Sequence, residues 1–265
     1  MSVLLGLKRV AKHPHHRHPR VVSVGGWVKR VDRVGGLYLL HIATDSPLSP
    51  EPPQFGMVWV PGMEAVPMTL IPESNDMVAI LVRPVGSTTR ALAAMRPGKR
   101  LRLIGPSGRG LRLEPGTAIV TGGSAAAVAL AYAYSGYEGP YLIASRSADE
   151  VLALRELLTG GVDAVTACEE GECDYLGTAV DALREGVIEA GAYLLAGPKP
   201  MLRGAYSILR ERGVLRASYA VVEVEVRCGT GACGLCRVPG TPYLLCVDGP
   251  ALPLSDLGMF LGVGR

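Results

Sequence analysis

The sequence predicts a multi-domain α+β protein with an antiparallel β-barrel, an α/β domain on a parallel sheet, and a small cysteine-rich C-terminal domain. Short apolar runs bounded by turn residues fill the first part of the chain, and strands alternate with helices in the second. Four of the six cysteines lie within the nineteen residues from Cys228 to Cys246. At ~150 residues per domain, 265 residues suffice for two or three domains. We expect an N-terminal segment at 1–19, the barrel at 20–113, the α/β domain at 114–217 and the cysteine-rich domain at 218–265.

The composition excludes several classes of protein. With 48% hydrophobic and 19% charged residues, the chain is too apolar to be disordered. Its weakly polar stretch at 117–136 lacks the ~20 strongly apolar residues of a membrane span, and no secretory signal precedes it, so we expect a cytoplasmic protein. A net charge of +3 without a basic stripe gives no reason to expect nucleic acid as a partner. The histidines at 13, 15, 16 and 18 fit a loose surface segment, to which we assign no function.

The first domain is predicted from strand-like runs of β-branched and apolar residues. Runs of this length, separated by Gly, Pro, Asn, Asp and Ser, are typical of a barrel or sandwich. A short helix fits residues 90–95, between two threonines and a Pro-Gly pair. The expected strands are 21–24, 37–42, 56–60, 77–82 and 100–103.

The second domain begins where the pattern changes to alternating strands and helices. Such alternation indicates βαβ units and a parallel sheet, whose ligands lie beyond the carboxyl ends of the strands. The expected strands are 117–121, 141–144, 164–166 and 192–196, and the expected helices are 125–134, 148–158, 176–185 and 200–212.

The cysteine cluster carries the most specific signal. Cys228, Cys233, Cys236 and Cys246 follow the spacing C-x4-C-x2-C-x9-C. C-x4-C-x2-C with a more distant fourth cysteine is the plant-type ferredoxin spacing, which supplies two thiolates to each iron of a [2Fe–2S] cluster. A zinc site normally has two C-x2-C knuckles and this segment has one, so iron–sulfur is favoured. We assign Cys168 and its C-x4-C partner to a surface loop, with a disulfide expected if the host is a hyperthermophile.

Two glycine-containing turns follow strands of the α/β domain. Gly122 and Gly123 lie between a strand and a helix, where backbone N–H groups can face a pyrophosphate. Gly197 and Pro198 occupy the same place after a later strand and can hold an aromatic ring against the backbone. Each pair is equally compatible with a plain turn.

Taken in order, these parts resemble the ferredoxin-reductase family. They are most similar to one branch, the electron-transfer subunits of heteromeric dihydroorotate dehydrogenase, which carry a C-terminal [2Fe–2S] domain. The segment Cys246-Val247-Asp248-Gly249-Pro250 is similar to that family's C-x-DGP ending. The segment Val66-Pro67-Met68-Thr69 lies where the family has its Arg-Pro-x-Ser flavin motif. The strand end Leu81-Val82-Arg83 and the pair Thr88-Thr89 resemble the strand and phosphate loop that follow.

The resemblance implies FAD on the barrel. Thr69 would hydrogen-bond near flavin N5, and the backbone of Val66, Pro67 and Met68 would line the isoalloxazine. The strand end Leu81-Val82-Arg83, with Thr88 and Thr89, would hold the pyrophosphate, a role that suits the bidentate geometry of Arg83. Because Val66 replaces the family's arginine, one phosphate contact is missing.

The same resemblance implies an NAD site on Gly122, Gly123, Gly197 and Pro198. Ser124 and Ala125 replace a third glycine and its neighbour, and Ala196 stands where many reductases have cysteine. These departures predict weak NAD(H) binding and leave room for another acceptor.

The combination of cofactors has a chemical logic. Nicotinamides exchange two electrons, a cluster of this type exchanges one, and a flavin can do both. The resemblance implies an oxidoreductase subunit without its own orotate site or catalytic residues. It would pass electrons from the FMN of a dihydroorotate dehydrogenase catalytic subunit through [2Fe–2S] and FAD to NAD or another acceptor, in a heterotetramer that serves pyrimidine biosynthesis. Two alternatives stay open: a reductase subunit of another complex, of the sulfide dehydrogenase, ferredoxin:NADP oxidoreductase or hydrogenase type, and a non-catalytic binding module stapled by zinc.

Overall fold

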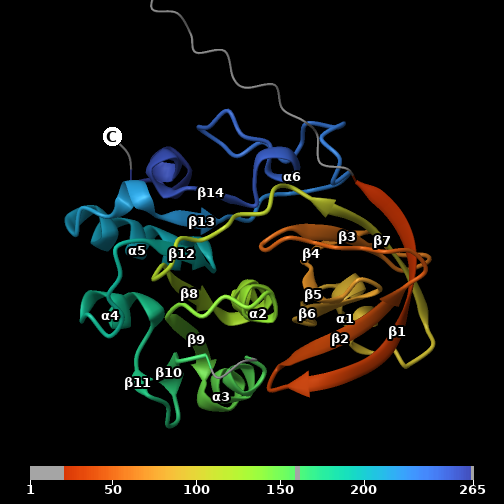
Figure 1. The fold of residues 1–265 in the computed structure, drawn as a ribbon, viewed down its shortest axis with the longest axis horizontal. Coiled ribbons are helices and arrows are strands. Elements are labelled where there is room, and N and C mark those ends of the chain that lie inside the picture. The colour runs from red at the N-terminus through yellow and green to blue at the C-terminus, as the bar shows by residue number, and fades with distance from the viewer. Residues whose placement is uncertain (1–20, 159–161, 264–265) are drawn as a thin grey trace, which may run out of the picture.

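The computed structural model describes residues 21–158 and 162–263, so the N-terminal segment with its four histidines lies outside the described part. Two seven-stranded sheets organise the chain (Figure 1). The first is the antiparallel sheet of the predicted barrel, and the second is largely parallel. In these described residues, no helix is both long and apolar enough to cross a membrane.

The first sheet has the strand order β4-β3-β7-β1-β2-β6-β5. Its strands alternate between residues that face the barrel interior and residues that face outward, as the two-residue period of a strand requires. The interior contains aliphatic side chains such as Val28, Leu40 and Leu103, which are fully buried. The strands are β1 (Val22–Val34), β2 (Leu37–Thr44), β3 (Phe55–Trp59), β4 (Val66–Thr69), β5 (Ile71–Ser74), β6 (Met77–Val82) and β7 (Arg100–Ser107).

Helix α1 (Ser87–Ala93) begins three residues earlier than the predicted helix at 90–95. Gly86 is its N-cap, and the Thr89 side chain satisfies the Gly86 N–H in a capping arrangement. The two threonines expected in a loop therefore lie in the first turn of α1.

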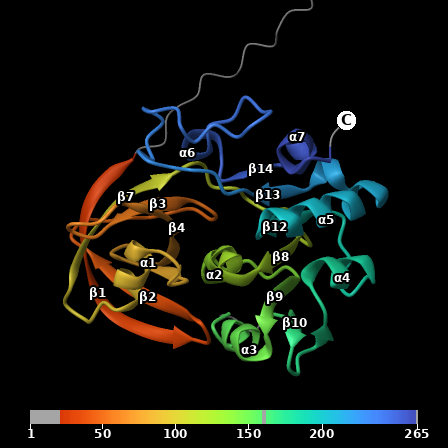
Figure 2. The same ribbon diagram turned by 180° about the vertical axis from the view of Figure 1, so that it is seen from behind.

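The second sheet has the order β11-β10-β9-β8-β12-β13-β14, and only its last pair is antiparallel. Helices α2 and α3 pack on the side that faces the barrel, while α4 and α5 lie on the other side (Figures 1 and 2). The strands are β8 (Ala118–Gly122), β9 (Tyr141–Ser147), β10 (Ala164–Glu170), β11 (Tyr175–Leu176), β12 (Tyr193–Ala196), β13 (Tyr219–Val221) and β14 (Ala251–Pro253). The helices are η1 (Gly123–Ala125), α2 (Ala126–Tyr134), α3 (Ala148–Glu156), α4 (Ala179–Arg184), α5 (Lys199–Glu211), η2 (Leu215–Ala217), α6 (Leu245–Asp248), η3 (Leu254–Leu257) and α7 (Gly258–Leu261).

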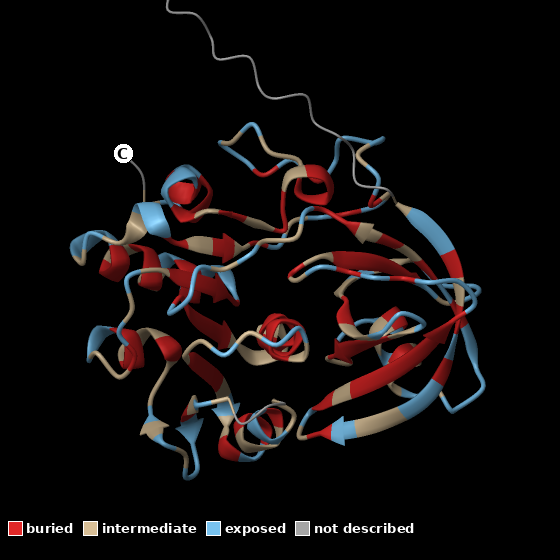
Figure 3. Ribbon diagram, in the orientation of Figure 1, coloured by how far each residue is buried: buried red, intermediate tan, exposed pale blue. Residues whose placement is uncertain are grey.

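Helix α2 explains how the two sheets are held together. It is nearly all alanine and aliphatic, and residues 126–133 are all buried, because one side packs on the second sheet and the other on Ile71, Ala79 and Leu81 of the barrel (Figure 3). Small side chains let both layers approach closely.

Helix α4 begins three residues later than predicted, because Tyr175 and Leu176 pair with β10 and Thr178 then caps the helix.

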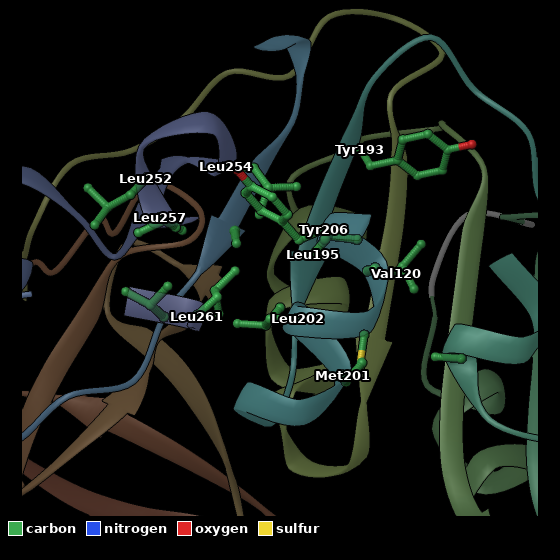
Figure 4. Packing of buried hydrophobic residues seen from close by; sticks show 14 of the residues in the cluster. Val120, Tyr193, Leu195, Met201, Leu202, Tyr206, Leu252, Leu254, Leu257 and Leu261 are labelled. Atoms are coloured by element: carbon green, nitrogen blue, oxygen red, sulfur yellow. The ribbon is translucent and has the colours of Figure 1, made fainter. Parts of the chain in front are cut away.

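The C-terminal segment continues the second sheet through β13 and β14. One apolar core runs from Val120, Leu195 and Leu202 into Leu254 and Leu257 (Figure 4). The predicted boundary at 217/218 therefore separates a cysteine-rich loop from the α/β domain in sequence, while the two share strands and a core in space.

Candidate functional site

The cysteine-rich loop lies between β13 and β14 and packs against the outer face of the barrel. The Ser107 hydroxyl, at the end of β7, donates a buried hydrogen bond of 2.7 Å to the carbonyl of Gly229. Gly229 has φ +68° and presses on Met57 of β3, where an added Cβ would lie 2.7 Å from the methionine side chain. Only glycine combines this backbone conformation with this close approach. The loop is thus seated on the strands next to the predicted flavin motif.

The four predicted cysteine ligands come together as two pairs. The sulfurs of Cys228 and Cys233 are 3.3 Å apart, and those of Cys236 and Cys246 are 3.2 Å apart. Within the described residues, no three His, Cys, Asp or Glu side chains gather as ligands of one metal ion. A [2Fe–2S] cluster takes two thiolates on each of its two irons, so paired sulfurs fit that group.

Backbone N–H groups point at these sulfurs. The Gly231 N–H donates to Cys246 Sγ at 3.1 Å, and the Thr230 N–H donates to Cys228 Sγ at 3.4 Å. Partial burial raises the pKa of the Cys228 thiol, but hydrogen bonds from Thr230 and Cys233 outweigh it and lower that pKa to about 6. Burial raises the pKa of Cys246 to about 12. The loop therefore stabilises a thiolate on its outer pair, and N–H groups of this kind tune cluster potentials.

The two pairs differ in access. Cys233 is exposed and Cys228 half-buried, whereas Cys236 and Cys246 are buried. Leu235, between the two pairs in sequence, is 52% exposed. One side of a bound cluster would therefore face the molecular surface and the other the shared apolar core.

The predicted flavin segment is β4, at the end of the strand order of the first sheet. Residues 66–69 pair antiparallel with residues 55–58 of β3, and they are half-buried or exposed. Leu81 is buried against α2 and Val82 is buried in the barrel interior, so only their backbone is placed to touch a ligand. Thr88 is buried and donates to the Glu64 carbonyl at 3.0 Å, which ties α1 to the turn between β3 and β4. Thr89 remains half-exposed at the start of α1.

Arg83 has a partner that sequence reasoning missed. Its guanidinium donates to the Glu150 carboxylate of α3 at 2.6 Å, and Ser145 of β9 donates to the same oxygen at 2.5 Å. Glu150 is only 4% exposed. An added Cβ at Gly123 would lie 3.5 Å from the Arg83 guanidinium. Arg83 therefore lies in the seam between the predicted FAD and NAD segments.

The two glycine turns of the α/β domain are neighbours because β8 and β12 pair in parallel. Both follow the carboxyl ends of their strands, where ligands bind in open α/β sheets. Met201 fills the space between them: a Cβ at Gly122 would lie 2.7 Å from its sulfur, and one at Gly197 would lie 2.5 Å from it. These glycines are needed for close packing, and Met201, in the first turn of α5, is a further residue of this edge.

The second cysteine pair is covalently joined. Cys168 and Cys173 form a disulfide with a Cα–Cα distance of 6.2 Å at the end of β10. The expectation of a surface-loop pair is wrong for Cys168, which is buried within β10, and only Cys173 lies in the turn that follows. The disulfide keeps both apart from the four free thiols.

Comparisons with known proteins agree on the family. The family model described as the iron-sulfur cluster binding domain of dihydroorotate dehydrogenase B matches residues 223–258. A probable dihydroorotate dehydrogenase B (NAD(+)) electron transfer subunit of Methanothermobacter thermautotrophicus is 30% identical over 220 residues, or 81% of this chain and 82% of that protein. The Thermococcus kodakarensis protein described in the same words is 32% identical over 205 residues, which cover 75% and 83% of the two chains.

Solved structures show the same fold at lower identity. A structure reported for flavin-based electron bifurcation by an NADH-dependent reduced ferredoxin-NADP oxidoreductase matches with a TM-score of 0.73 and 21% identity. The match covers 87% of this chain and 88% of that one. A ferredoxin reductase of carbazole 1,9a-dioxygenase matches with a TM-score of 0.63 and 19% identity, covering 76% and 69%. The barrel followed by a parallel sheet is thus a ferredoxin-reductase-like fold.

Proposed function

The chain belongs to the family of dihydroorotate dehydrogenase B electron-transfer subunits, and we propose that it links dihydroorotate oxidation in a separate FMN-containing subunit to reduction of NAD. The two subunits would form a heterotetramer that serves pyrimidine biosynthesis. A cytoplasmic location is part of the proposal, since clustered cysteines that hold a metal centre are typical of intracellular proteins. When bound, [2Fe–2S] exchanges single electrons, and FAD exchanges one or two, which joins the two kinds of partner.

The pairing of the four free thiols is the observation that carries the proposal. Cys228 and Cys233 would hold one iron, and Cys236 and Cys246 the other, because each pair is already within 3.3 Å. Four thiols around a single zinc ion would instead form one tetrahedral set. The zinc-stapled binding module therefore fits the loop less well.

FAD would lie along β4 and α1. Val66, Pro67, Met68 and Thr69 offer an accessible strand to the flavin ring, with the Thr69 hydroxyl as a hydrogen-bonding group near N5. Leu81 and Val82 would contribute backbone, and Thr88 would position α1 through its bond to the turn after β3. Thr89 and Arg83 would face the pyrophosphate, and to do so Arg83 would share its donors between the phosphate and Glu150.

NAD would bind across the carboxyl edge of the second sheet. Gly122 and Gly123 would face its pyrophosphate, since they open into η1 and α2, and Gly197 and Pro198 would flank the nicotinamide. These two turns lie beside each other over Met201. The chain itself contributes positioning and shields the sites from water.

Reconstitution with the catalytic subunit tests the proposed function. The holoprotein is co-purified with the FMN-containing dihydroorotate dehydrogenase subunit of the same organism and supplied with dihydroorotate and NAD. We expect NADH to form only when both subunits are present. A reductase subunit of another complex would leave NADH formation at the level of the catalytic subunit alone, while still reducing dyes with NADH.

A further inference from the structure

Among the residues that the structure describes, none covers the part of the outer barrel face that lies beyond the cysteine-rich loop. Side chains of a strand alternate between its two faces, so Phe55, Met57 and Trp59 of β3 share the outer one. Phe55 and Met57 are buried in the core that includes Cys236 and Cys246, whereas Trp59 is 37% exposed. Trp59 lies two positions after Met57, roughly 7 Å along the strand. Trp59 is therefore the first outward-facing residue of β3 that the cysteine-rich loop does not bury.

Neighbouring strands extend this surface in register. Arg102 of β7 lies opposite Trp59 on one side and opposite Gly25 of β1 on the other. Arg100 lies opposite Trp27, which is also 37% exposed. Directly opposed residues of antiparallel strands project on the same side of the sheet. Trp27, Trp59, Arg100 and Arg102 therefore form one surface, the Trp–Arg face.

A hollow of about 320 Å³ lies within the Trp–Arg face, lined by both tryptophans and both arginines. At Gly25, opposite Arg102, the Asp45 carboxylate takes the space of a side chain, since an added Cβ would lie 2.5 Å from its oxygen. The Asp45 carboxylate closes one side and accepts a hydrogen bond of 3.0 Å from the Gly25 N–H. These are the only two tryptophans of the chain, in which aromatic residues make up 5%. Tryptophan and arginine are the residue types that most often dominate protein–protein binding energies.

We propose that the Trp–Arg face is the docking surface for the catalytic subunit, an inference that rests on the proposed function. The hollow would receive an apolar side chain of that subunit, flanked by carboxylates that pair with Arg100 and Arg102. The position of the Trp–Arg face beside the cysteine-rich loop favours the catalytic subunit as its partner. The face is continuous with the strand residues on which the loop of Cys228 and Gly229 is seated, and a protein that delivers electrons to this loop must lie close to it (Figure 1).

Binding of charge-reversed variants tests the surface. The variant Arg100→Glu/Arg102→Glu is compared with Arg203→Glu/Arg210→Glu, an equal change on exposed residues of α5, on the far side of the second sheet from the barrel. Affinity for the catalytic subunit is measured on holoprotein, and bound FAD, iron content and NADH-driven dye reduction are measured on the isolated chain. We expect at least tenfold weaker binding for the first variant, near wild-type binding for the control, and unchanged cofactors and dye reduction for both. Trp59→Ala should weaken binding by a similar factor without changing the charge.

Fluorine NMR signals from labelled tryptophans report binding at the Trp–Arg face directly. A chain labelled with 5-fluorotryptophan gives two signals, assigned with Trp59→Phe, and the catalytic subunit is added unlabelled. We expect both signals to shift or broaden as the complex forms. Equal binding of the two charge variants, or a complex that leaves both signals unchanged, overturns the docking surface while NADH formation by the wild-type complex still supports the proposed function. A wild-type holoprotein that does not bind the catalytic subunit overturns both.

Discussion

Arg83, at the end of the barrel strand β6, donates a 2.6 Å hydrogen bond to the buried carboxylate of Glu150 on α3. The pair joins residues 67 apart in sequence and closes the seam between the two sheets. Ser145 donates to the same carboxylate, and Gly35 packs against the Glu150 backbone, where an added Cβ would lie 2.8 Å from the Glu150 Cα.

Replacing the two partners separately should separate two roles of Arg83. Glu150→Gln should cost about 1–2 kcal/mol of stability, less than a fully buried pair because the Arg83 side chain is 36% exposed. Its FAD content should stay near wild type, since Arg83 is then free for the phosphate. Arg83→Ala should lose FAD as well, because a charge-assisted phosphate contact contributes about 1.5–3 kcal/mol. Thermal unfolding measures the loss of stability, and FAD retention after dialysis measures the loss of FAD. Equal FAD loss in the two variants would mean that the pair only holds the two sheets together and that Arg83 does not bind the phosphate.

The cluster ligands predict a selective effect of cysteine replacement. Wild-type protein prepared without oxygen should contain about two irons per chain and give the electron spin resonance signal of a reduced [2Fe–2S] cluster. Cys233→Ser should lower the iron content, because it removes one member of the exposed pair. The matched control is Cys173→Ser, which breaks the disulfide and should leave iron content unchanged. About one zinc per chain and no iron would contradict the assignment.

His41 predicts a pH dependence of stability. It is 5% exposed, and its ring nitrogens lie 2.5 Å from Glu73 and 2.9 Å from Asp32. The hydrogen bond to Glu73 raises the pKa of His41, while burial and the charge of Arg30 oppose the rise. Tyr134 of α2 lies close enough to feel the same charges. A raised folded-state pKa adds stability below the unfolded value of about 6.5 and loses it as pH rises through the folded value.

The thermal midpoint of the wild type relative to His41→Gln should therefore fall as pH increases above about 6.5. Both proteins are measured with oxidised cofactors over the same pH series. A difference that stays constant or grows with pH would show that His41 is uncharged in the folded state.

The nucleotide edge predicts weak binding of NAD(H). Ser124 and Ala125 put Cβ atoms where a glycine would leave the backbone open, and Met201 already fills the space between the two glycine turns. Stopped-flow reduction of the bound flavin by NADH should saturate only toward the upper end of the usual range of roughly 1 µM to 1 mM. Saturation at a few micromolar would show that the altered turn does not hinder binding.

Local patterns in the sequence predicted most of the elements but not strands β4, β5 and β11, and they could not predict contacts between distant segments. The strand runs of the barrel and the alternation after residue 117 correspond to observed strands and helices, because period and turn residues are local signals. The four thiols lie in two pairs, and their assignment as cluster ligands stays a prediction. The site assignments on the barrel and the second sheet stay predictions.

The pairing of Arg83 with Glu150 and the addition of β13 and β14 to the second sheet were not predicted. Both depend on which distant residues meet after folding, and neither produces a periodic pattern of residues in the sequence. The same holds for the Trp–Arg face: Trp27 and Trp59 lie in separate strands, and only the position of β7 between them brings them to one hollow.

Electron entry from dihydroorotate tests the central claim most directly. The oxidised holoprotein is mixed without oxygen with the FMN-containing catalytic subunit, dihydroorotate is added, and the visible absorption of flavin and iron–sulfur is followed. We expect bleaching at the wavelengths of both cofactors within the complex, and no bleaching when the catalytic subunit is omitted. If both subunits are fully loaded with cofactors and the absorption still does not change after dihydroorotate is added, the result would contradict an electron-transfer role in this reaction.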